Sequence, residues 1–212
     1  RFAKLNASRV PRAFRLPLAN ICRRAGLCHL GITLLFRVIR PGRSGAAVPA
    51  TPAEVAEYAV LLLRTGALNE ALVLLENVDA ERVPESLLYR AFCHFSRFEF
   101  VEAVPLLDRY LQAPLAPYAS LVGKVNLGFA LVGSQQDTRA VEVLEESLKV
   151  ASENSHTRLQ CNILGLRAQT YLRAANFAKA RADLEHAHGL LGFGVTPDQG
   201  FIIKWKAFLE TI

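Results

Sequence analysis

The sequence predicts an all-α protein made of stacked helical hairpins, and three observations lead to this prediction. A small residue is followed after twelve residues by alanine and after four more by leucine, and this triplet recurs along the chain. Apolar residues recur at helical spacing around each triplet. Several of the candidate helices begin at recognisable capping signals. The four triplets are Ala59/Ala71/Leu75, Ala91/Ala103/Leu107, Gly128/Ala140/Leu144 and Ala168/Ala180/Leu184.

Each triplet is expected to join the two helices of one hairpin. The small residues let the helices approach closely, and the leucine fills the space between them. Successive triplets begin 32, 37 and 40 residues apart. This is the period of helical repeat proteins, in which each hairpin packs only on its neighbours.

The first hairpin is expected to begin at Thr51, followed by Pro52 at the first helical position and Glu54, which closes a capping box. Gly66 marks the turn of this hairpin, because glycine interrupts the helical pattern there. The other hairpins are expected at residues 84–112, with a turn near Phe98, at 117–152, with a turn over 133–137, and at 156–191, with a turn over 175–177.

A last helix is expected after Thr196, since Thr196-Pro197-Asp198-Gln199 repeats the arrangement of cap, proline and capping box. A terminal repeat needs such a helix to cover its outer face. The apolar face that it offers comprises Phe201, Ile202, Trp205, Phe208 and Leu209.

Composition agrees with a globular protein, because 51% of the 212 residues are hydrophobic and 21% are charged. No apolar run reaches the roughly 18 to 20 residues that a membrane-spanning helix needs. The four cysteines form no CxxC pair, and Cys22, Cys28 and His29 lack a fourth metal ligand. We therefore expect reduced cysteines, no metal and no cofactor.

Charge divides the chain into two parts. Residues 1–50 contain nine arginines and one lysine but no acidic residue, whereas residues 51–212 contain fifteen basic and nineteen acidic residues. We therefore predict three domains: a basic N-terminal extension over 1–50, a repeat domain over 51–195 and a capping helix over 196–212.

The repeats resemble the tetratricopeptide repeat (TPR) family over about residues 51–195. RTGALNEALVLL at 64–75 and RAANFAKARADL at 173–184 are the segments most similar to the family's turn and second helix. The family places a small residue at position 8, alanine at position 20 and a large apolar residue near position 24. The resemblance implies a right-handed superhelix of about four hairpins, whose common role is to hold other proteins.

The family's concave groove is lined by positions 2, 5, 9, 12 and 13 of each first helix. An apolar groove of this kind would be covered by an amphipathic helix or an extended apolar segment. Two alternatives stay open: these side chains pack between repeats, or residues 27–39 fill the groove. The expected groove residues are Val60, Leu63, Arg64, Leu88, Phe92, Phe95, Val125, Asn126, Phe129, Val132, Gln169 and Leu172.

The basic extension has the composition of an organelle transit peptide and also of an arm that lies on RNA or on an acidic or lipid surface. We expect a mitochondrial or other organellar location, with the bacterial cytoplasm as the alternative. The arginines expected to contact such a surface are Arg9, Arg12, Arg15, Arg23, Arg24, Arg37 and Arg40.

Two other functions are compatible with residues 21–36. The segment loosely resembles the helix-turn-helix of TetR-type regulators, with Ile21, Ala25, Gly26 and Phe36 at matching offsets. That resemblance implies a bacterial regulator whose repeat domain acts as a sensor. An interfacial membrane adaptor is the other alternative, in which an apolar set would enter the lipid surface. That set comprises Leu30, Ile32, Leu34, Leu35 and Phe36.

No motif for catalysis is present: there is no phosphate-binding glycine loop, nucleophile elbow or HExxH sequence. His186 and His188 are two residues apart, so a helix would point them away from each other. The sequence therefore predicts a non-catalytic interaction scaffold, which we expect to be a structural subunit of a large macromolecular complex.

Overall fold

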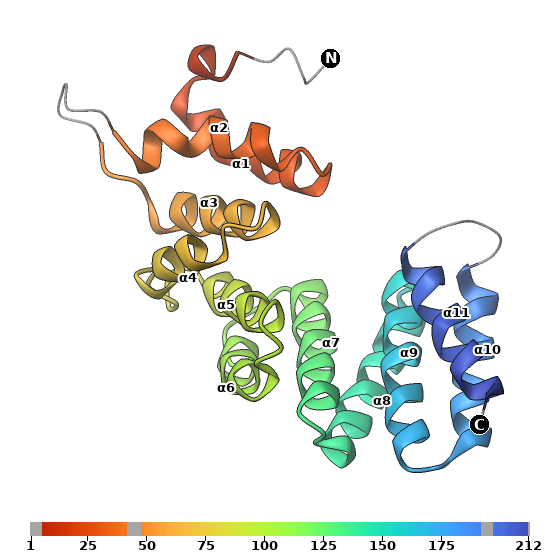
Figure 1. Ribbon diagram of the computed structural model, residues 1–212. Helices are drawn as coiled ribbons and strands as arrows, with labels where there is room; N and C mark the ends of the chain where they lie inside the picture. The colour runs from red at the N-terminus through yellow and green to blue at the C-terminus, as the bar shows by residue number, and fades with distance from the viewer. Residues whose placement is uncertain (1–5, 42–47, 192–196, 212) are drawn as a thin grey trace. The chain divides into compact units, whose positions relative to one another are not determined.

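The computed structural model describes residues 6–41, 48–191 and 197–211 (Figure 1). These residues form α-helices and one short 3-10 helix, and none of them lies in a strand. The predicted all-α class is therefore confirmed. The chain divides into two compact units, Arg1–Arg97 (unit 1) and Phe98–Ile212 (unit 2).

Unit 1 contains the 3-10 helix and the first five α-helices. Its core joins Ala19 and Leu35 to Ala59, Leu61 and Leu75, so the N-terminal helices share one hydrophobic core with the first predicted repeat. The elements are η2 (Ala7–Arg9), α1 (Arg12–Arg24), α2 (Cys28–Ile39), α3 (Pro52–Arg64), α4 (Leu68–Glu76) and α5 (Glu85–Phe95).

Residues 12–39, which were predicted to belong to a basic extension, form a helical hairpin that packs on α3. The same triplet spacing occurs here as Ala19/Gly31/Leu35. All three residues are buried, and a Cβ atom added at Gly31 would lie 2.9 Å from the side chain of Leu61. The hairpin is thus a further repeat that the sequence analysis missed. Because residues 28–39 form its second helix, packed on α1 and α3, they do not fill a groove as a separate segment.

Arg12 ties this hairpin to α3. Its guanidinium donates hydrogen bonds to both carboxylate oxygens of Glu54, at 3.0 and 3.3 Å, and to the carbonyl oxygens of Val48 and Pro49, each at 2.6 Å. Glu54 also closes the predicted capping box with Thr51. Burial by itself raises the pKa of a carboxyl group, but the hydrogen bonds from Arg12 and Thr51 outweigh it and lower the pKa of Glu54.

Unit 2 contains the remaining helices, and each packs on the next one along the chain. The last helix, α11, packs on both α9 and α10 and buries Ile202 and Leu209 in their core. The expected N-cap Thr196 lies outside the described residues. The helices are α6 (Phe100–Leu111), α7 (Pro117–Gly133), α8 (Asp137–Glu153), α9 (Thr157–Arg173), α10 (Phe177–Leu191) and α11 (Pro197–Glu210).

The turns inside the hairpins share one backbone conformation. The second residue after α1, α3, α7 and α9, and the third residue after α5, has a positive φ angle, which ends the helix and redirects the chain. Glycine occupies this position twice, whereas the other three residues adopt a conformation that side chains disfavour. The positions are Gly26 (74°), Gly66 (91°), Phe98 (60°), Gln135 (60°) and Ala175 (54°).

Replacing Gly128 with valine is expected to lower the free energy of unfolding by about 2 kcal/mol, the usual size of an overpacking penalty. A Cβ atom at Gly128 would lie 2.5 Å from Cδ2 of Leu144, so the α7–α8 contact has no room for a side chain. Urea unfolding followed by the fluorescence of Trp205, the single tryptophan, measures the change. Gly189→Ala is the control, because a Cβ there has no neighbour within 4 Å. Stability equal to that of the original protein in both variants would contradict close packing at the triplet.

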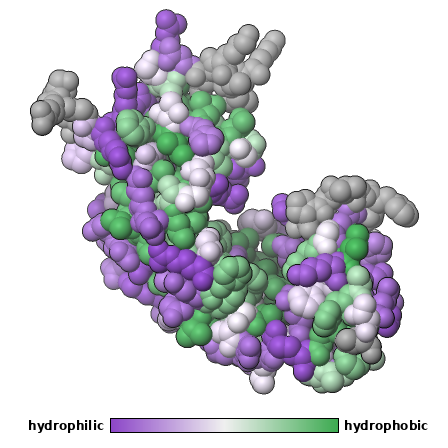
Figure 2. All heavy atoms as spheres, in the orientation of Figure 1, coloured by the Kyte–Doolittle hydropathy of each residue, from purple (hydrophilic) through white to green (hydrophobic). Residues whose placement is uncertain are grey.

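No helix in the described ranges is long and apolar enough to cross a membrane. The four cysteines are free thiols, and burial raises the pKa of Cys93 to about 11. Hydrophobic residues on the face drawn in Figure 2 are interspersed with hydrophilic ones in both units.

Candidate partner-binding cleft

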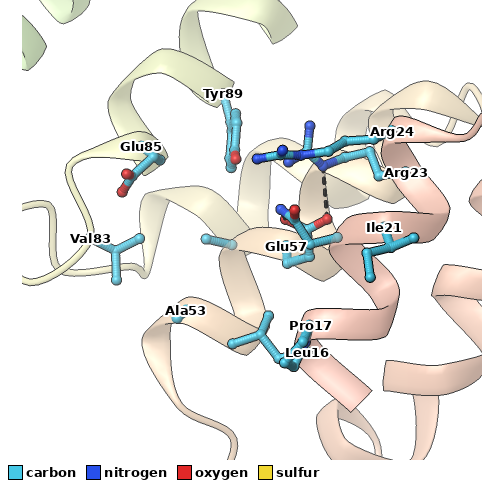
Figure 3. A pocket seen from close by; sticks show the side chains of 12 residues that line it. Leu16, Pro17, Ile21, Arg23, Arg24, Ala53, Glu57, Val83, Glu85 and Tyr89 are labelled. Carbon is cyan, nitrogen blue, oxygen red and sulfur yellow. Dashed lines mark hydrogen bonds and ion pairs between the residues drawn. The ribbon is translucent and has the colours of Figure 1, made fainter. Parts of the chain in front are cut away.

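A cleft of about 650 Å³ lies in unit 1, between α1, α3 and the start of α5 (Figure 3). These three helices, together with Val83, which lies before α5, supply the lining. The residues that line it are Leu16, Pro17, Asn20, Ile21, Arg23, Arg24, Ala53, Ala56, Glu57, Val83, Glu85 and Tyr89.

Part of the lining falls in the register that the TPR resemblance assigns to partner binding, whereas Glu57 and Tyr89 lie outside it, at position 6. With the small residue of each triplet as position 8, α1 contributes positions 5, 9, 12 and 13, namely Leu16, Asn20, Arg23 and Arg24. Helix α3 contributes Ala53 and Ala56 at positions 2 and 5. The short alanine side chains at these positions leave the space that the cleft occupies.

Buried Glu57 organises the polar side of the cleft. Nε of Arg23 donates a hydrogen bond to Oε1 of Glu57 at 2.7 Å, and Nδ2 of Asn20 donates to Oε2 at 3.2 Å. Burial alone would lower the pKa of Arg23, but the hydrogen bond to Glu57 outweighs it, so the pKa of Arg23 is raised and its charge is retained. The network fixes the Arg23 guanidinium at the wall of the cleft.

Tyr89, which lies on α5, faces the two arginines of α1. Figure 3 shows Arg23 and Arg24 extending from α1 toward this ring, and the Arg23 guanidinium carbon lies 5.8 Å from the ring centroid. Burial, more than any charged neighbour, raises the pKa of Tyr89, so the hydroxyl is neutral near pH 7. Arg24 is exposed and has no ion pair among the described residues, whereas Glu85 places a negative charge on the opposite wall.

The predicted groove residues of unit 1 fall into two classes. Val60 and Leu88 are 1% and 6% exposed, so they pack between helices, as the inter-repeat alternative expected. Leu63, Phe92 and Phe95 are half-buried, and Arg64 is exposed. None of the six lines the cleft.

Unit 2 shows the same division. Val125 and Val132 are 6% and 4% exposed, whereas Phe129 is 36% exposed and packs edge-to-face on Phe100 at 5.3 Å between ring centroids. Asn126 and Gln169 are half-buried and donate to carbonyl oxygens of their own helices, and Leu172 is half-buried. Whether any of these residues binds a partner stays a prediction.

Three arginines of the predicted basic arm make ion pairs within unit 1. Arg12, Arg23 and Arg40 pair with Glu54, Glu57 and Glu70 of α3 and α4. Each of these arginines therefore uses its charge to hold the N-terminal hairpin to the next one. Nε of Arg15 donates to the carbonyl oxygen of Val10 at 2.9 Å. Arg9, Arg24 and Arg37 are exposed without an ion pair to a described residue.

The apolar set that an interfacial membrane adaptor would need is mostly buried. Leu34 and Leu35 are 1% and 0% exposed, and Leu30 and Ile32 pack against the cores of unit 1. Only Phe36 of this set is exposed. A helix-turn-helix is not favoured either, because α2 buries Gly31, Leu34, Leu35 and Val38 and packs on α1 and α3 as the second helix of a repeat.

Within the described part of the chain, no group of three or more His, Cys, Asp or Glu side chains lies close enough to hold a metal ion. The cleft brings together two cations, one buried and one exposed acid, an aromatic ring and an apolar floor.

A scan against protein-family models found no match, and a search of curated proteins found none either. Solved structures do match. A thermophilic TPR protein from Thermus thermophilus is similar with a TM-score of 0.66 at 14% identity, over 95% of this chain and 100% of that one. A Podospora anserina protein with nearly identical TPR-like repeats gives 0.62 at 20% identity, over 86% and 97% of the two chains.

MamA from strain MSR-1 is similar at a TM-score of 0.61 and 15% identity, over 84% of this chain and 95% of that one. All three similarities extend over most of both chains. Because the sequence identities are low, these matches show the fold alone. The repeat register, the helical hairpins and these matches agree, and the chain has the fold of the tetratricopeptide-repeat proteins.

Proposed function

We propose that the protein is a non-catalytic interaction scaffold that holds an extended segment of another protein in the cleft of unit 1. The observation that supports this most directly is the lining: three successive first helices contribute an apolar floor and polar walls on the face that the TPR resemblance assigns to partners. Protein-binding grooves combine a few placed polar groups with apolar contact in this way.

Charge indicates which segment would fit. Arg24 is uncompensated at one end of the cleft, and the charge on Arg23 is shared with Glu57. An acidic side chain next to an apolar residue would meet Arg24 and the floor of Leu16, Ile21 and Ala56 together. Glu85 on the far wall would disfavour a second acid there and favour a basic or neutral residue.

Arg24→Glu is expected to weaken the binding of an acidic, apolar peptide by about tenfold, because it replaces an attraction by a repulsion at an exposed site. The probe is a displayed library of random peptides selected on the chain of residues 1–212. Its best acidic peptide is then synthesised and measured by fluorescence polarisation. Arg24 is exposed, so thermal unfolding should be unchanged.

Arg109→Glu is the matched control, since Arg109 is an exposed arginine on α6 of unit 2 and changes the net charge equally. It should leave the affinity unchanged. A library that returns no peptide, or one whose selected peptides bind both variants equally, would show that this cleft does not recognise an acidic segment.

The amino-acid composition also leads us to propose an assembly and a cellular location. We place the protein in a large assembly within a mitochondrion or another organelle, because residues 1–50 are rich in arginine and contain no acid. The pairing of Arg12, Arg23 and Arg40 leaves fewer arginines for an RNA or acidic surface than the composition suggests. Expression of the tagged chain of residues 1–212, followed by fractionation of the cells and detection of the tag in each fraction, tests the location.

A further inference from the structure

A second concavity, of about 350 Å³, lies at the N-terminal end of unit 1 between η2, α1 and α2. It shares no residue with the partner-binding cleft. A small core of Val10, Cys22 and Leu34, against which Ala7 packs, holds η2 on the first hairpin. The lining residues are Asn6, Ala7, Ser8, Arg15, Thr33 and Arg37.

No ion pair with a described residue neutralises the positive charge of this concavity. Two arginines from different helices line it, and no lining residue is acidic. The nearest segments in sequence cannot supply an acid, because residues 1–50 contain none. Glu54, Glu57 and Glu70 of the following hairpin are already paired with other arginines.

The Ser8 and Thr33 hydroxyls donate within the protein, which leaves Arg15, Arg37 and Asn6 as the donors of this site. The bond from Nε of Arg15 to the carbonyl oxygen of Val10 fixes the guanidinium plane, and its terminal nitrogens have no acceptor among the described residues. Oδ1 of Asn6 accepts both the amide and the hydroxyl of Ser8, at 3.1 and 2.6 Å, so the remaining group of Asn6 is its NH₂ donor. The Thr33 hydroxyl donates to the carbonyl oxygen of His29.

We propose that this concavity, formed by Arg15, Arg37 and Asn6, binds the phosphate group of a phosphate monoester. A terminal phosphate presents three acceptor oxygens and about two negative charges, which match two guanidinium groups that approach from separate helices. A phosphodiester in the middle of a strand offers two oxygens and one charge, and RNA binding needs a track of several phosphates rather than one recess. The proposal is independent of the partner-binding cleft.

Glycerol 3-phosphate titrated into the chain of residues 1–212 by isothermal calorimetry tests the site. Arg37→Gln is expected to weaken binding by about tenfold or more, because a charge-assisted hydrogen bond is lost. Arg15→Lys keeps the charge but loses the fixed fork, and it should weaken binding by a smaller factor. Arg109→Gln is the control, since it removes an equal charge from an exposed arginine that lines neither this concavity nor the cleft. Thermal unfolding confirms that each variant is folded.

Two further probes identify the source of the phosphate. If vesicles of phosphatidylcholine with phosphatidic acid retain the protein and Arg37→Gln abolishes this, the monoester is a lipid headgroup. If only glycerol 3-phosphate binds in an Arg37-dependent manner, it is a soluble molecule. Absence of binding to both probes overturns the proposal, as does an equal loss in Arg109→Gln. Arg37-dependent binding of a 5′-hydroxyl RNA oligonucleotide in preference to both monoesters would also overturn it.

Discussion

Replacing Leu35 with alanine is expected to lower the free energy of unfolding of unit 1 by about 3 kcal/mol, the middle of the range for a buried leucine. Leu35 is 0% exposed and belongs to the same core as Ala59 and Leu61 of the next hairpin. The single tryptophan lies in unit 2, so its fluorescence does not report on this change. Native-state hydrogen exchange of the amides in α2 and α3 measures it directly.

Two further variants set the scale for this result. Leu75 occupies the equivalent position of the next triplet and is also 0% exposed, so Leu75→Ala should cost about as much. Phe36, the neighbour of Leu35, is 47% exposed, and Phe36→Ala should cost less than about 1 kcal/mol. If Leu35→Ala behaves like Phe36→Ala rather than like Leu75→Ala, the N-terminal hairpin is not an integral repeat.

The N-terminal hairpin shows where sequence reasoning stopped short. Ala19, Gly31 and Leu35 carry the same spacing of twelve and four residues as the recognised triplets, and Gly26 marks the turn as Gly66 does. The signal was present, but the acid-free composition of residues 1–50 suggested an arm. The triplet spacing indicates how helices pack, whereas the net charge of a segment indicates its solvation and its possible partners. In residues 12–39 the packing signal was the correct guide to the structure.

The ion-pair partners of its arginines explain why the basic composition of residues 1–50 wrongly suggested an arm. The acids that neutralise Arg12, Arg23 and Arg40 lie 42, 34 and 30 residues away in sequence, on the hairpin that follows. No local pattern joins these residues, because stacking of the repeats brings them together. A segment that has no acid of its own can therefore be an ordinary folded repeat.

The helices were more predictable than the cleft. The triplets located helices over residues 51–191, and the capping box at Thr51 located the start of α3, because both signals depend on local chemistry. The groove register stays a prediction, and it was applied only from residue 51. The predicted groove therefore did not include α1, which contributes Asn20, Arg23 and Arg24 to the cleft. Apolar groove positions such as Val60 and Val132 pack between helices, since a side chain at the edge of a helix interface is readily covered by its neighbours.

Arg167→Ala is expected to lower the free energy of unfolding of unit 2 by about 3 kcal/mol, the low end of the range for breaking a buried ion pair. Nε and a terminal nitrogen of Arg167 donate to the two carboxylate oxygens of Asp183 at 2.7 and 2.6 Å, joining α9 to α10. The Asp183 side chain is only 9% exposed, so removal of the arginine leaves a buried charge without its partner. Because α11 packs on both helices, urea unfolding followed by Trp205 fluorescence reports the loss.

The size of this effect depends on burial rather than on the number of ion pairs. Arg139 pairs with Asp108, but these side chains are 42% and 36% exposed, so Arg139→Ala should cost less than about 1 kcal/mol. Combining Arg167→Met with Asp183→Leu should recover most of the stability, because an apolar pair of similar volume avoids the desolvation cost. A double variant as unstable as Arg167→Ala would show that packing between α9 and α10, and not an unpaired charge, is what the single substitution destroys.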